Sequence, residues 1–345
     1  MKIYPIFRAL LFRLDPEQAH RLTLACLRLA GQLPPIRSFM RRIFVLPTPG
    51  LERSVAGLDF SNPIGLAAGY DKDGTATVGL SCLGFGHLEL GTVTPKPQSG
   101  NPRPRIFRLP QDQGLINSMG FPNQGGLQLV RRLQKGKPKD VLIGVNIGKG
   151  AATPIEEAAE DYLMLWHLVA PRADYIAVNV SSPNTVGLRR LQARDLLEGL
   201  LGQLTAGRRT SGPDRPIFVK LAPDLTAEEM SDAVSAAIGA GIDGLIATNT
   251  TISRPALRSG NHQQQGGLSG YPLKVISLAF VRRLVQQVDG RLPVIGVGGI
   301  DDGPSAKAML AVGADLIQVY TGLVYQGPFL VRSMLSYLSS QQDEM

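Results

Sequence analysis

The sequence Tyr175-Ile176-Ala177-Val178-Asn179-Val180-Ser181-Ser182-Pro183-Asn184 joins a short apolar run directly to a polar segment. β-Branched and aromatic residues are typical of a buried strand, and Ser, Pro and Asn are common where a strand enters a loop. An ordinary turn has the same composition, because these residues favour turns whatever the function. The alternative is a catalytic loop, in which the strand delivers polar side chains to a reaction site. The rest of the chain bears on this choice.

The same pattern recurs along the chain from residue 62 onward, with helical stretches between the apolar runs. The predicted strands are residues 64–67, 87–91, 141–146, 175–180, 217–221, 244–248, 293–297 and 315–320. The predicted helices lie near residues 73–83, 155–170, 193–207, 226–240, 273–288 and 304–312, with a last helix after Pro328. Eight buried strands with helical crossovers favour an α/β fold, the (β/α)8 TIM barrel, over an open doubly wound sheet.

Two longer connections interrupt the alternation, at residues 94–139 and 252–269. Each follows the C-terminal end of a strand, where the loops that cover a barrel's active site belong. In a barrel, all strand ends of this kind face one mouth. Nearly every strand ends in a small amide, a hydroxyl or a lysine. In chain order the residues at these ends are Ala68, Gly69, Asp71, Lys72, Thr92, Asn146, Asn179, Ser182, Asn184, Lys220, Thr248, Asn249, Thr250, Gly298, Gly299, Tyr320 and Thr321. The sequence therefore predicts an active site at this mouth.

Glycines and lysines near these strand ends indicate an anionic ligand. Residues 296–300 and 320–322 follow the last two strands, where this fold often binds phosphate through backbone N–H groups, and residues 266–270 add further glycines. Lys72 and Lys220 lie on or just after apolar strands, and a buried lysine is costly unless it meets an anion. The sequence predicts a phosphorylated ligand. A structural salt bridge is the alternative for each lysine.

The composition, with 43% apolar and 19% charged residues, is that of a folded protein and excludes a disordered or fibrous chain. Cys26 and Cys82 are predicted to be core residues in a reducing compartment, with no disulfide. The four histidines show no metal-ligand spacing, so no metal site is expected.

The net charge of +8 is concentrated in residues 1–45, which carry eight basic and two acidic side chains among many apolar residues. No apolar run approaches the roughly 18 to 20 residues needed to span a bilayer, and no secretory signal is expected. The predicted elements are two short helices. One covers residues 5–14, and the other starts with Asp15 as N-cap and Pro16 and ends with Gly31 as C-cap. Such a basic apolar pair can lie on an anionic lipid surface. The alternative is a helical hairpin that caps the main domain.

The motifs along the chain resemble, in the same order, those of the dihydroorotate dehydrogenases. They are Gly69-Tyr70-Asp71-Lys72, Gly91-Thr92-Val93-Thr94-Pro95, Phe107-Arg108-Leu109, Ile116-Asn117-Ser118-Met119-Gly120-Phe121, Asn146-Ile147-Gly148-Lys149, residues 179–184, Val219-Lys220-Leu221-Ala222-Pro223-Asp224, Thr248-Asn249-Thr250, and residues 266–270, 296–300 and 320–322. Leu14-Asp15-Pro16-Glu17 with Ala19-His20 resembles the helical extension of the membrane-associated, quinone-dependent class 2 enzymes. The resemblance implies two domains, a membrane-associating and quinone-access extension at 1–45 and an FMN-binding barrel at 46–345.

The resemblance implies oxidation of (S)-dihydroorotate to orotate in pyrimidine (UMP) biosynthesis, with bound FMN and a membrane quinone as electron acceptors. Ser182 is implied to be the base that takes the C5 proton while hydride leaves C6. Soluble class 1 enzymes have cysteine at this position. A serine hydroxyl is a weak base at neutral pH and needs a proton path, for which Thr185 is a candidate.

Further roles follow from the same resemblance. The implied substrate-binding residues are Lys72, Asn117, Ser118, Met119, Gly120, Phe121, Asn179, Asn184, Asn249 and Thr250. The implied cofactor-binding residues are Ala68, Gly69, Tyr70, Asp71, Lys72, Thr92, Asn146, Asn179, Lys220, Thr248, Gly270, Gly299, Tyr320 and Thr321. The implied quinone-access residues are His20, Arg108 and Tyr320.

The chain departs from the class 2 pattern at three positions. Ser118 stands where arginine is common, Pro122 where asparagine is frequent, and Tyr70 where the family has an apolar residue. The expected partners are dihydroorotate, a membrane quinone and an anionic lipid surface, without nucleic acid, and the protein is expected to be a monomer. We expect a peripheral protein on the cytoplasmic side of a bacterial inner membrane.

Two alternatives of other classes remain. A different FMN barrel enzyme, such as a hydroxy-acid oxidase or a soluble dihydroorotate dehydrogenase, would be favoured by cysteine at position 182 or by the absence of the helical leader. A catalytically silent barrel, tethered to a membrane by its basic helices, would contain no flavin.

Overall fold

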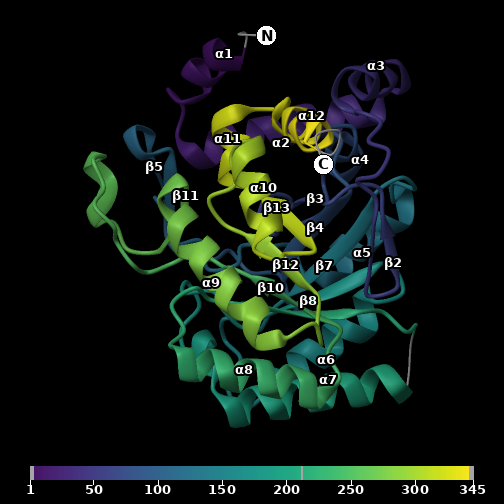
Figure 1. The fold of residues 1–345 in the computed structure, drawn as a ribbon, viewed down its shortest axis with the longest axis vertical. Helices are drawn as coiled ribbons and strands as arrows, with labels where there is room; N and C mark the ends of the chain where they lie inside the picture. The colour runs from purple at the N-terminus through teal and green to yellow at the C-terminus, as the bar shows by residue number, and fades with distance from the viewer. Residues whose placement is uncertain (1–3, 211–212, 342–345) are drawn as a thin grey trace.

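The protein is described by a computed structural model that covers residues 4–210 and 213–341. Eight parallel strands form a closed barrel and follow one another around it in chain order (Figure 1). They are β3 (Ile64–Leu66), β4 (His87–Val93), β7 (Leu142–Ile147), β8 (Tyr175–Asn179), β9 (Ile217–Leu221), β10 (Gly244–Ala247), β12 (Val294–Val297) and β13 (Leu316–Val319). The predicted TIM barrel is confirmed, and each predicted strand lies within two residues of its observed bounds.

Helices cover the outside of the barrel and bury their apolar faces against the strands. They are α4 (Thr77–Ser81), α5 (Gly126–Gly136), α6 (Ala158–Val169), α7 (Arg194–Thr210), α8 (Ala227–Ala240), α9 (Lys274–Val288), α10 (Gly303–Ala311), α11 (Thr321–Gln326) and α12 (Leu330–Ser340). Side chains cap the N-terminal ends of some of these helices. The Thr226 hydroxyl accepts from the backbone N–H of Glu229, and the Glu229 carboxylate accepts from that of Thr226, forming a capping box at α8.

A hairpin closes one end of the barrel. It is formed by β1 (Arg53–Val55) and β2 (Leu58–Phe60), which pair antiparallel. Val55 and Phe60 are buried among the side chains that fill the barrel interior, including Tyr175 and Phe218. The strands run from this closed end toward the opposite mouth. Polar residues at their C-terminal ends therefore meet at the open side.

The two long connections contain regular structure that the sequence did not predict. Strands β5 (Ile106–Leu109) and β6 (Gly114–Asn117), from the first connection, pair antiparallel, and β11 (Gly267–Gly270), from the second, pairs with β6. The resulting three-stranded sheet lies beside the barrel (Figure 1). Short 3₁₀ turns, η1 (Pro110–Asp112), η2 (Leu188–Gln192), η3 (Gly260–Gln263) and η4 (Tyr271–Leu273), complete these connections and the one after β8.

Three helices precede the barrel: α1 (Tyr4–Leu11), α2 (Pro16–Gln32) and α3 (Pro34–Phe44). The predicted N-cap is confirmed, because the Asp15 side chain accepts from the N–H groups of Glu17 and Gln18. The predicted C-cap is wrong, because Gly31 lies inside α2 and Leu33 follows the helix. The prediction of only two helices is also wrong. The proposed division of the chain after residue 45 stays a prediction.

Gly31 has a packing role instead. A Cβ atom on Gly31 would lie 2.6 Å from the backbone nitrogen of Gly79, and one on Gly79 would lie 2.0 Å from the carbonyl oxygen of Leu27. Helices α2 and α4 therefore cross with their backbones in direct contact, which only glycine permits. This crossing fixes the N-terminal helices against the barrel.

Cys82 is buried as predicted, but Cys26 is exposed on α2, so the prediction of a core position is wrong for Cys26. Across residues 4–210 and 213–341, none of the helices combines the length and apolar character that a membrane crossing requires.

Candidate active site

A cavity lies at the C-terminal ends of the barrel strands, with an empty volume of about 1090 Å³ that includes open solvent at its mouth. Most of the residues predicted from the sequence line it: Ala68, Gly69, Lys72, Thr92, Asn117, Met119, Gly120, Phe121, Asn179, Ser182, Asn184, Lys220, Thr248, Asn249, Thr250, Gly270, Gly299, Tyr320 and Thr321. They come from segments far apart in the chain, which the closed barrel and the β5–β6–β11 sheet bring together.

The remaining predicted residues do not line the cavity: His20, Tyr70, Asp71, Arg108, Ser118 and Asn146. The buried Asp71 carboxylate accepts from the backbone N–H groups of Thr75 and Ala76, and thus orders the segment that follows β3. Burial raises the pKa of Asp71. The backbone N–H of Ser118 donates to the carbonyl of Arg105, the residue before β5, at 2.9 Å.

Ser182 lies on a loop held by amide side chains. The backbone N–H of Asn184 donates to Ser182 Oγ at 3.3 Å, and Asn184 Nδ2 donates to Asn117 Oδ1 at 3.0 Å. On the other side, Asn249 Nδ2 donates to Ser181 Oγ at 3.0 Å. Ser182 is only 5% exposed. A hydroxyl, three amides and the cavity therefore converge at one place.

Lys72 enters the cavity from the segment after β3. Its Nζ donates to the Gly69 carbonyl at 2.8 Å. Within the described part of the chain it forms no ion pair, which differs from the salt-bridge alternative. Burial lowers the pKa of Lys72 to about 8. A poorly solvated ammonium of this kind favours an incoming anion.

Lys220 has a carboxylate partner beneath the cavity. Its Nζ lies 3.2 Å from Glu89 Oε1, and the Glu89 side chain is fully buried. Asn146 Nδ2 and Gln318 Nε2 donate to the same carboxylate at 2.8 and 2.7 Å. The salt-bridge alternative therefore applies to Lys220, although Lys220 also lines the cavity. Asn179 is paired in register with Lys220, so both groups lie at the same level of the barrel.

The residues present fit an elongated anionic cofactor. The Lys220 ammonium lies at one part of the cavity, and glycine backbones line another. Gly299 has a φ of 68°, and a Cβ there would lie 2.2 Å from Lys274 Cα, so the close chain path requires glycine. Helix α11 begins at Thr321, and the first N–H groups of a helix lack intrahelical acceptors. The Lys220 ammonium and these backbone N–H groups suit a phosphorylated ligand with a polar ring system.

Aromatic rings connect α2 to the cavity. The His20 ring lies 5.0 Å from the Tyr70 ring, and Tyr70 lies 5.6 Å from Tyr320, both edge to face. Tyr320 also lines the cavity. Burial lowers the pKa of His20 to about 4, so this ring is neutral at physiological pH. The three rings form a continuous contact between the N-terminal helices and the site.

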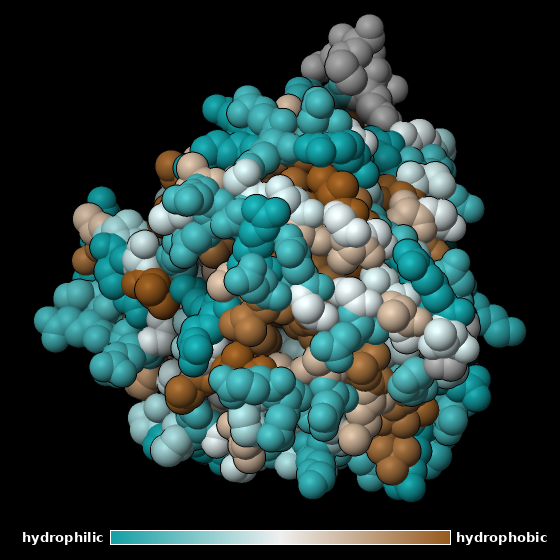
Figure 2. Space-filling model, turned by 90° about the horizontal axis from the view of Figure 1, so that it is seen from below, coloured by the Kyte–Doolittle hydropathy of each residue, from teal (hydrophilic) through white to brown (hydrophobic). Residues whose placement is uncertain are grey.

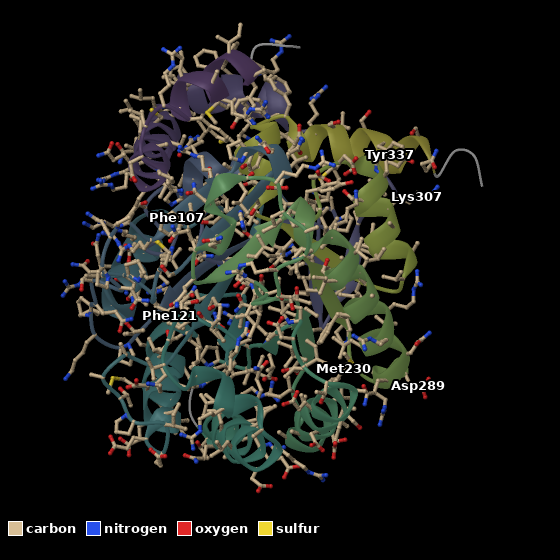
Figure 3. The ribbon with its side chains drawn as sticks, turned by 90° about the vertical axis from the view of Figure 1, so that its left-hand side faces the viewer. Phe107, Phe121, Met230, Asp289, Lys307 and Tyr337 are labelled. Carbon is tan, nitrogen blue, oxygen red and sulfur yellow. The ribbon has the colours of Figure 1, made fainter. Side chains whose placement is uncertain are left out.

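Arg108 lies apart from these rings. Its guanidinium is 4.5 Å from the Phe12 ring centroid and donates to the Leu14 carbonyl at 2.7 Å. It therefore attaches β5 to the segment between α1 and α2. Figure 3 shows Phe107, its neighbour on β5, close to the N-terminal helices, with Phe121 further along the same side.

Several residues of the site were missed from the sequence. They are Ile106, Leu115, Leu273 and Gln318 in the cavity wall, and Glu89 beneath it. Glu89 and Gln318 were detectable as polar residues inside otherwise apolar strands. The apolar lining residues carry no such signal, because apolar side chains occupy every buried surface.

Comparisons with known proteins agree with the geometry. The family model described as "Dihydroorotate dehydrogenase" matches residues 50–341. A protein from Roseiflexus sp. (strain RS-1), named "Dihydroorotate dehydrogenase (quinone)", is 47% identical over 332 residues, or 96% of this chain and 92% of the relative. A protein of the same name from Acidithiobacillus ferrooxidans is 46% identical and covers 97% of this chain and 94% of its own length.

Solved structures give the same result. The crystal structure of ligand-free DHODH from Eimeria tenella is 38% identical, with a TM-score of 0.88 and 96% of each chain covered. A second structure from that organism, in complex with ferulenol, has a TM-score of 0.86. The family indicated by the sequence motifs is confirmed. From the shared sequence and fold, the chain belongs to the dihydroorotate dehydrogenase family, as a relative of its quinone-dependent enzymes.

Proposed function

We propose that this protein oxidises (S)-dihydroorotate to orotate, with FMN as hydride acceptor and a membrane quinone as final electron acceptor, in the synthesis of UMP. The observation that carries the proposal is the position of Ser182. Ser182 lines the cavity together with Asn117, Asn184 and Asn249, and its hydroxyl accepts from the backbone N–H of Asn184. Quinone-dependent relatives with 47% and 46% identity support the same reaction.

The chemistry of the substrate step needs a base near C5. Ser182 accepts the C5 proton while hydride leaves C6, and a double bond forms between the two carbons. The hydroxyl must then lose its own proton. Thr185 is a candidate for this path, since it is buried and its Oγ1 has no hydrogen-bond partner among the described residues. An unpartnered buried hydroxyl is free to exchange a proton with Ser182 or with water.

The remaining polar groups suit the rest of the substrate. Lys72 binds the carboxylate, and Asn117, Asn184, Asn249 and Thr250 bind the ring amides, because asparagine offers both a donor and an acceptor. Asn179 and the segment Ser118-Met119-Gly120-Phe121 complete the substrate side. Phe121 and Met119 line the cavity, and their apolar side chains exclude water from the reacting carbons.

FMN would be held on the other side of the cavity. Bound there, FMN would supply the acceptor for the C6 hydride and the electrons for the quinone. We assign Lys220, Thr92, Asn146, Asn179 and Thr248 to its ring system. The phosphate side would be bound by Gly270, Gly299, Tyr320 and Thr321. The proposed ring-side contacts also include Ala68, Gly69, Tyr70, Asp71 and Lys72.

We assign quinone access and membrane binding to the N-terminal helices. His20, Tyr70 and Tyr320 form the proposed quinone path, and Arg108, which binds the segment between α1 and α2, is a further proposed quinone-access residue. Helices α1 to α3 expose apolar side chains beside arginines, which supports contact with an anionic lipid surface. We propose that residues 1–45 form this extension and that the protein is a monomer on the cytoplasmic side of the inner membrane.

The direct test is spectroscopic. The purified protein is expected to show a flavin spectrum that dihydroorotate bleaches without oxygen, and a short-chain quinone is expected to restore it. The extracted cofactor should be FMN by mass. A colourless protein would support the silent-barrel alternative. A flavoprotein that dihydroorotate does not bleach would refute the proposal.

Ser182→Ala tests the role of the base. The variant is expected to retain FMN and to bind orotate, because neither depends on the hydroxyl. Its flavin reduction by dihydroorotate should slow by about 10² to 10⁴-fold, the usual contribution of general-base catalysis. Stopped-flow absorbance under anaerobic conditions measures this rate. Reduction at the parent rate would show that Ser182 is not the base.

A further inference from the structure

Arg189 lies on η2, the 3₁₀ turn that follows the segment of residues 181–185, here called the serine loop. Its Nε donates to the Ser181 carbonyl at 3.0 Å, and its Nη2 donates to the Thr250 carbonyl at 2.9 Å. Ser181 directly precedes Ser182, and Thr250 lies in the segment of residues 249–253, here called the amide loop. One guanidinium thus joins the two loops that flank the site.

A carboxylate fixes the orientation of this guanidinium. Arg189 Nη1 lies 2.8 Å from Asp224 Oδ2, with side-chain exposures of only 22% and 14%. Partial burial strengthens such a pair relative to a fully exposed one. The Asp224 carboxylate also accepts from the Thr251 hydroxyl and from the backbone N–H of Ile252 at 3.2 Å. The amide loop is therefore bound both directly by Arg189 and indirectly through Asp224.

The turn that carries Arg189 is itself anchored. Leu188 is fully buried and Leu191 is 2% exposed, so both apolar side chains are in the core. Gln192 Oε1 accepts from the backbone N–H of Ala222 at 2.9 Å. These contacts leave Arg189 little freedom to move away from the two loops. Its neighbour Arg190 is exposed, which makes the two adjacent arginines different in kind.

We propose that Arg189, held by Asp224, is a positioning residue that sets the distance between Ser182 and the amides that bind the substrate. The inference rests on the proposed function, because it assumes that Ser182 is the base. A base must be within hydrogen-bond reach of the proton it removes, and a shift of about 1 Å in such a site can cost about 100-fold in rate. Lysine cannot replace this residue, since its single ammonium lacks the planar fork that meets two carbonyls and a carboxylate.

The test uses Arg189→Lys, with Arg190→Lys as the matched control. Anaerobic stopped flow measures the limiting rate of flavin reduction at saturating dihydroorotate. We expect Arg189→Lys to slow this rate by about 100-fold. FMN content, the orotate Kd measured from the flavin spectrum, and reoxidation by a short-chain quinone should match the parent. Arg190→Lys should match the parent in every measurement.

Asp224→Asn provides a second variant that applies the same test if Arg189→Lys fails to fold. It is expected to slow reduction in the same way. The double variant Arg189→Lys/Asp224→Asn should be no slower than the slower single variant, because both changes break one network.

Two results would overturn the inference while the proposed function stands: an Arg189→Lys variant that is reduced at the parent rate, or one whose FMN content and orotate affinity fall together with its rate. The second result would indicate a general scaffold role. If dihydroorotate does not reduce the parent protein itself, the proposed function fails, and the inference fails with it.

Discussion

Lys72 is the residue whose ionisation is expected to control substrate binding. Burial lowers its pKa to about 8, so its ammonium form predominates below this pH and the neutral amine above it. The dihydroorotate carboxylate is ionised throughout this range. We therefore predict that kcat/KM for dihydroorotate, which reports the free enzyme, falls as pH rises through about 8.

Steady-state profiles of kcat/KM between about pH 6 and pH 10 measure this effect. The control is Lys72→Met, which should have a lower kcat/KM at neutral pH and no decrease with this midpoint. A parent profile that stays flat up to about pH 10 would contradict the assignment of the carboxylate to Lys72.

Some residues of the site could be predicted from the sequence, and others could not. Lys72, Ser182 and Asn249 were predictable because each stands where an apolar run ends, and barrel strand ends converge. The pairing of Glu89 with Lys220 was not predictable, although Glu89 itself was detectable as a polar residue inside an apolar strand. Its strand and that of Lys220 are not neighbours in the sheet, so the contact depends on side chains that cross the barrel interior. The spacing of residues along the chain carries no information about that crossing.

Contacts between helices are equally hard to predict from local sequence patterns. Gly31 resembles a C-cap in sequence, because glycine commonly ends helices. Its actual role depends on Gly79, on a different helix, against which α2 packs with direct backbone contact. The β5–β6–β11 sheet was missed for a related reason, since β11 joins β6 across 150 residues of chain. Local patterns predict elements well, but they do not predict which elements touch.

The α2–α4 crossing makes an element-scale prediction. In Gly79→Ala, the new methyl group would lie 2.0 Å from the Leu27 carbonyl oxygen and must push the two backbones apart. Overpacking of this kind destabilises by about 1 to 3 kcal/mol, which exceeds the gain from the better helix propensity of alanine. We expect a lower free energy of unfolding in urea and a raised KM for quinone, with flavin reduction by dihydroorotate unchanged.

Gly199→Ala is the control for this change. Gly199 lies in α7, and a Cβ atom there would meet nothing within 4 Å. The substitution should stabilise the protein by about 0.5 to 1 kcal/mol through helix propensity alone. If Gly79→Ala also stabilised the protein, the close crossing of α2 and α4 would be refuted.

At the scale of the whole molecule, the two ends differ in surface character. The N-terminal helices lie at one end and α7 and α8 at the other (Figure 1). Figure 2, which looks at the molecule from the α7 and α8 end, shows hydrophobic residues in separate clusters among hydrophilic ones. The segment from α1 to α3, in contrast, exposes Ile6, Phe7, Leu10, Leu22, Leu29, Leu33, Ile36 and Phe39. Arg13, Arg21, Arg28 and Arg37 are exposed on the same segment.

This asymmetry has a functional reason under the proposed reaction. A membrane quinone is dissolved in lipid, whereas dihydroorotate arrives from water. The ring contacts from His20 to Tyr320 connect the apolar end to the cavity. Docking of α1 to α3 on the bilayer would therefore place the quinone path next to the lipid, while the rest of the molecule stays in water.

Replacing exposed apolar side chains of α1 and α3 is expected to separate membrane docking from quinone chemistry. Phe7, Leu10 and Phe39 are 58%, 54% and 64% exposed, so changing all three to serine should leave the fold intact. Each such side chain contributes about 1.5 to 3 kcal/mol when buried in an apolar medium, and 1.4 kcal/mol is tenfold in affinity. Binding to anionic vesicles should fall by at least about 100-fold in co-sedimentation. Turnover with a long-chain quinone in vesicles should fall with it, and turnover with a short-chain soluble quinone should remain.

Leu127→Ser/Met164→Ser, on α5 and α6, is the control and should bind vesicles like the parent. Vesicle binding that survives the triple change would mean that the N-terminal helices are only a structural cap on the barrel.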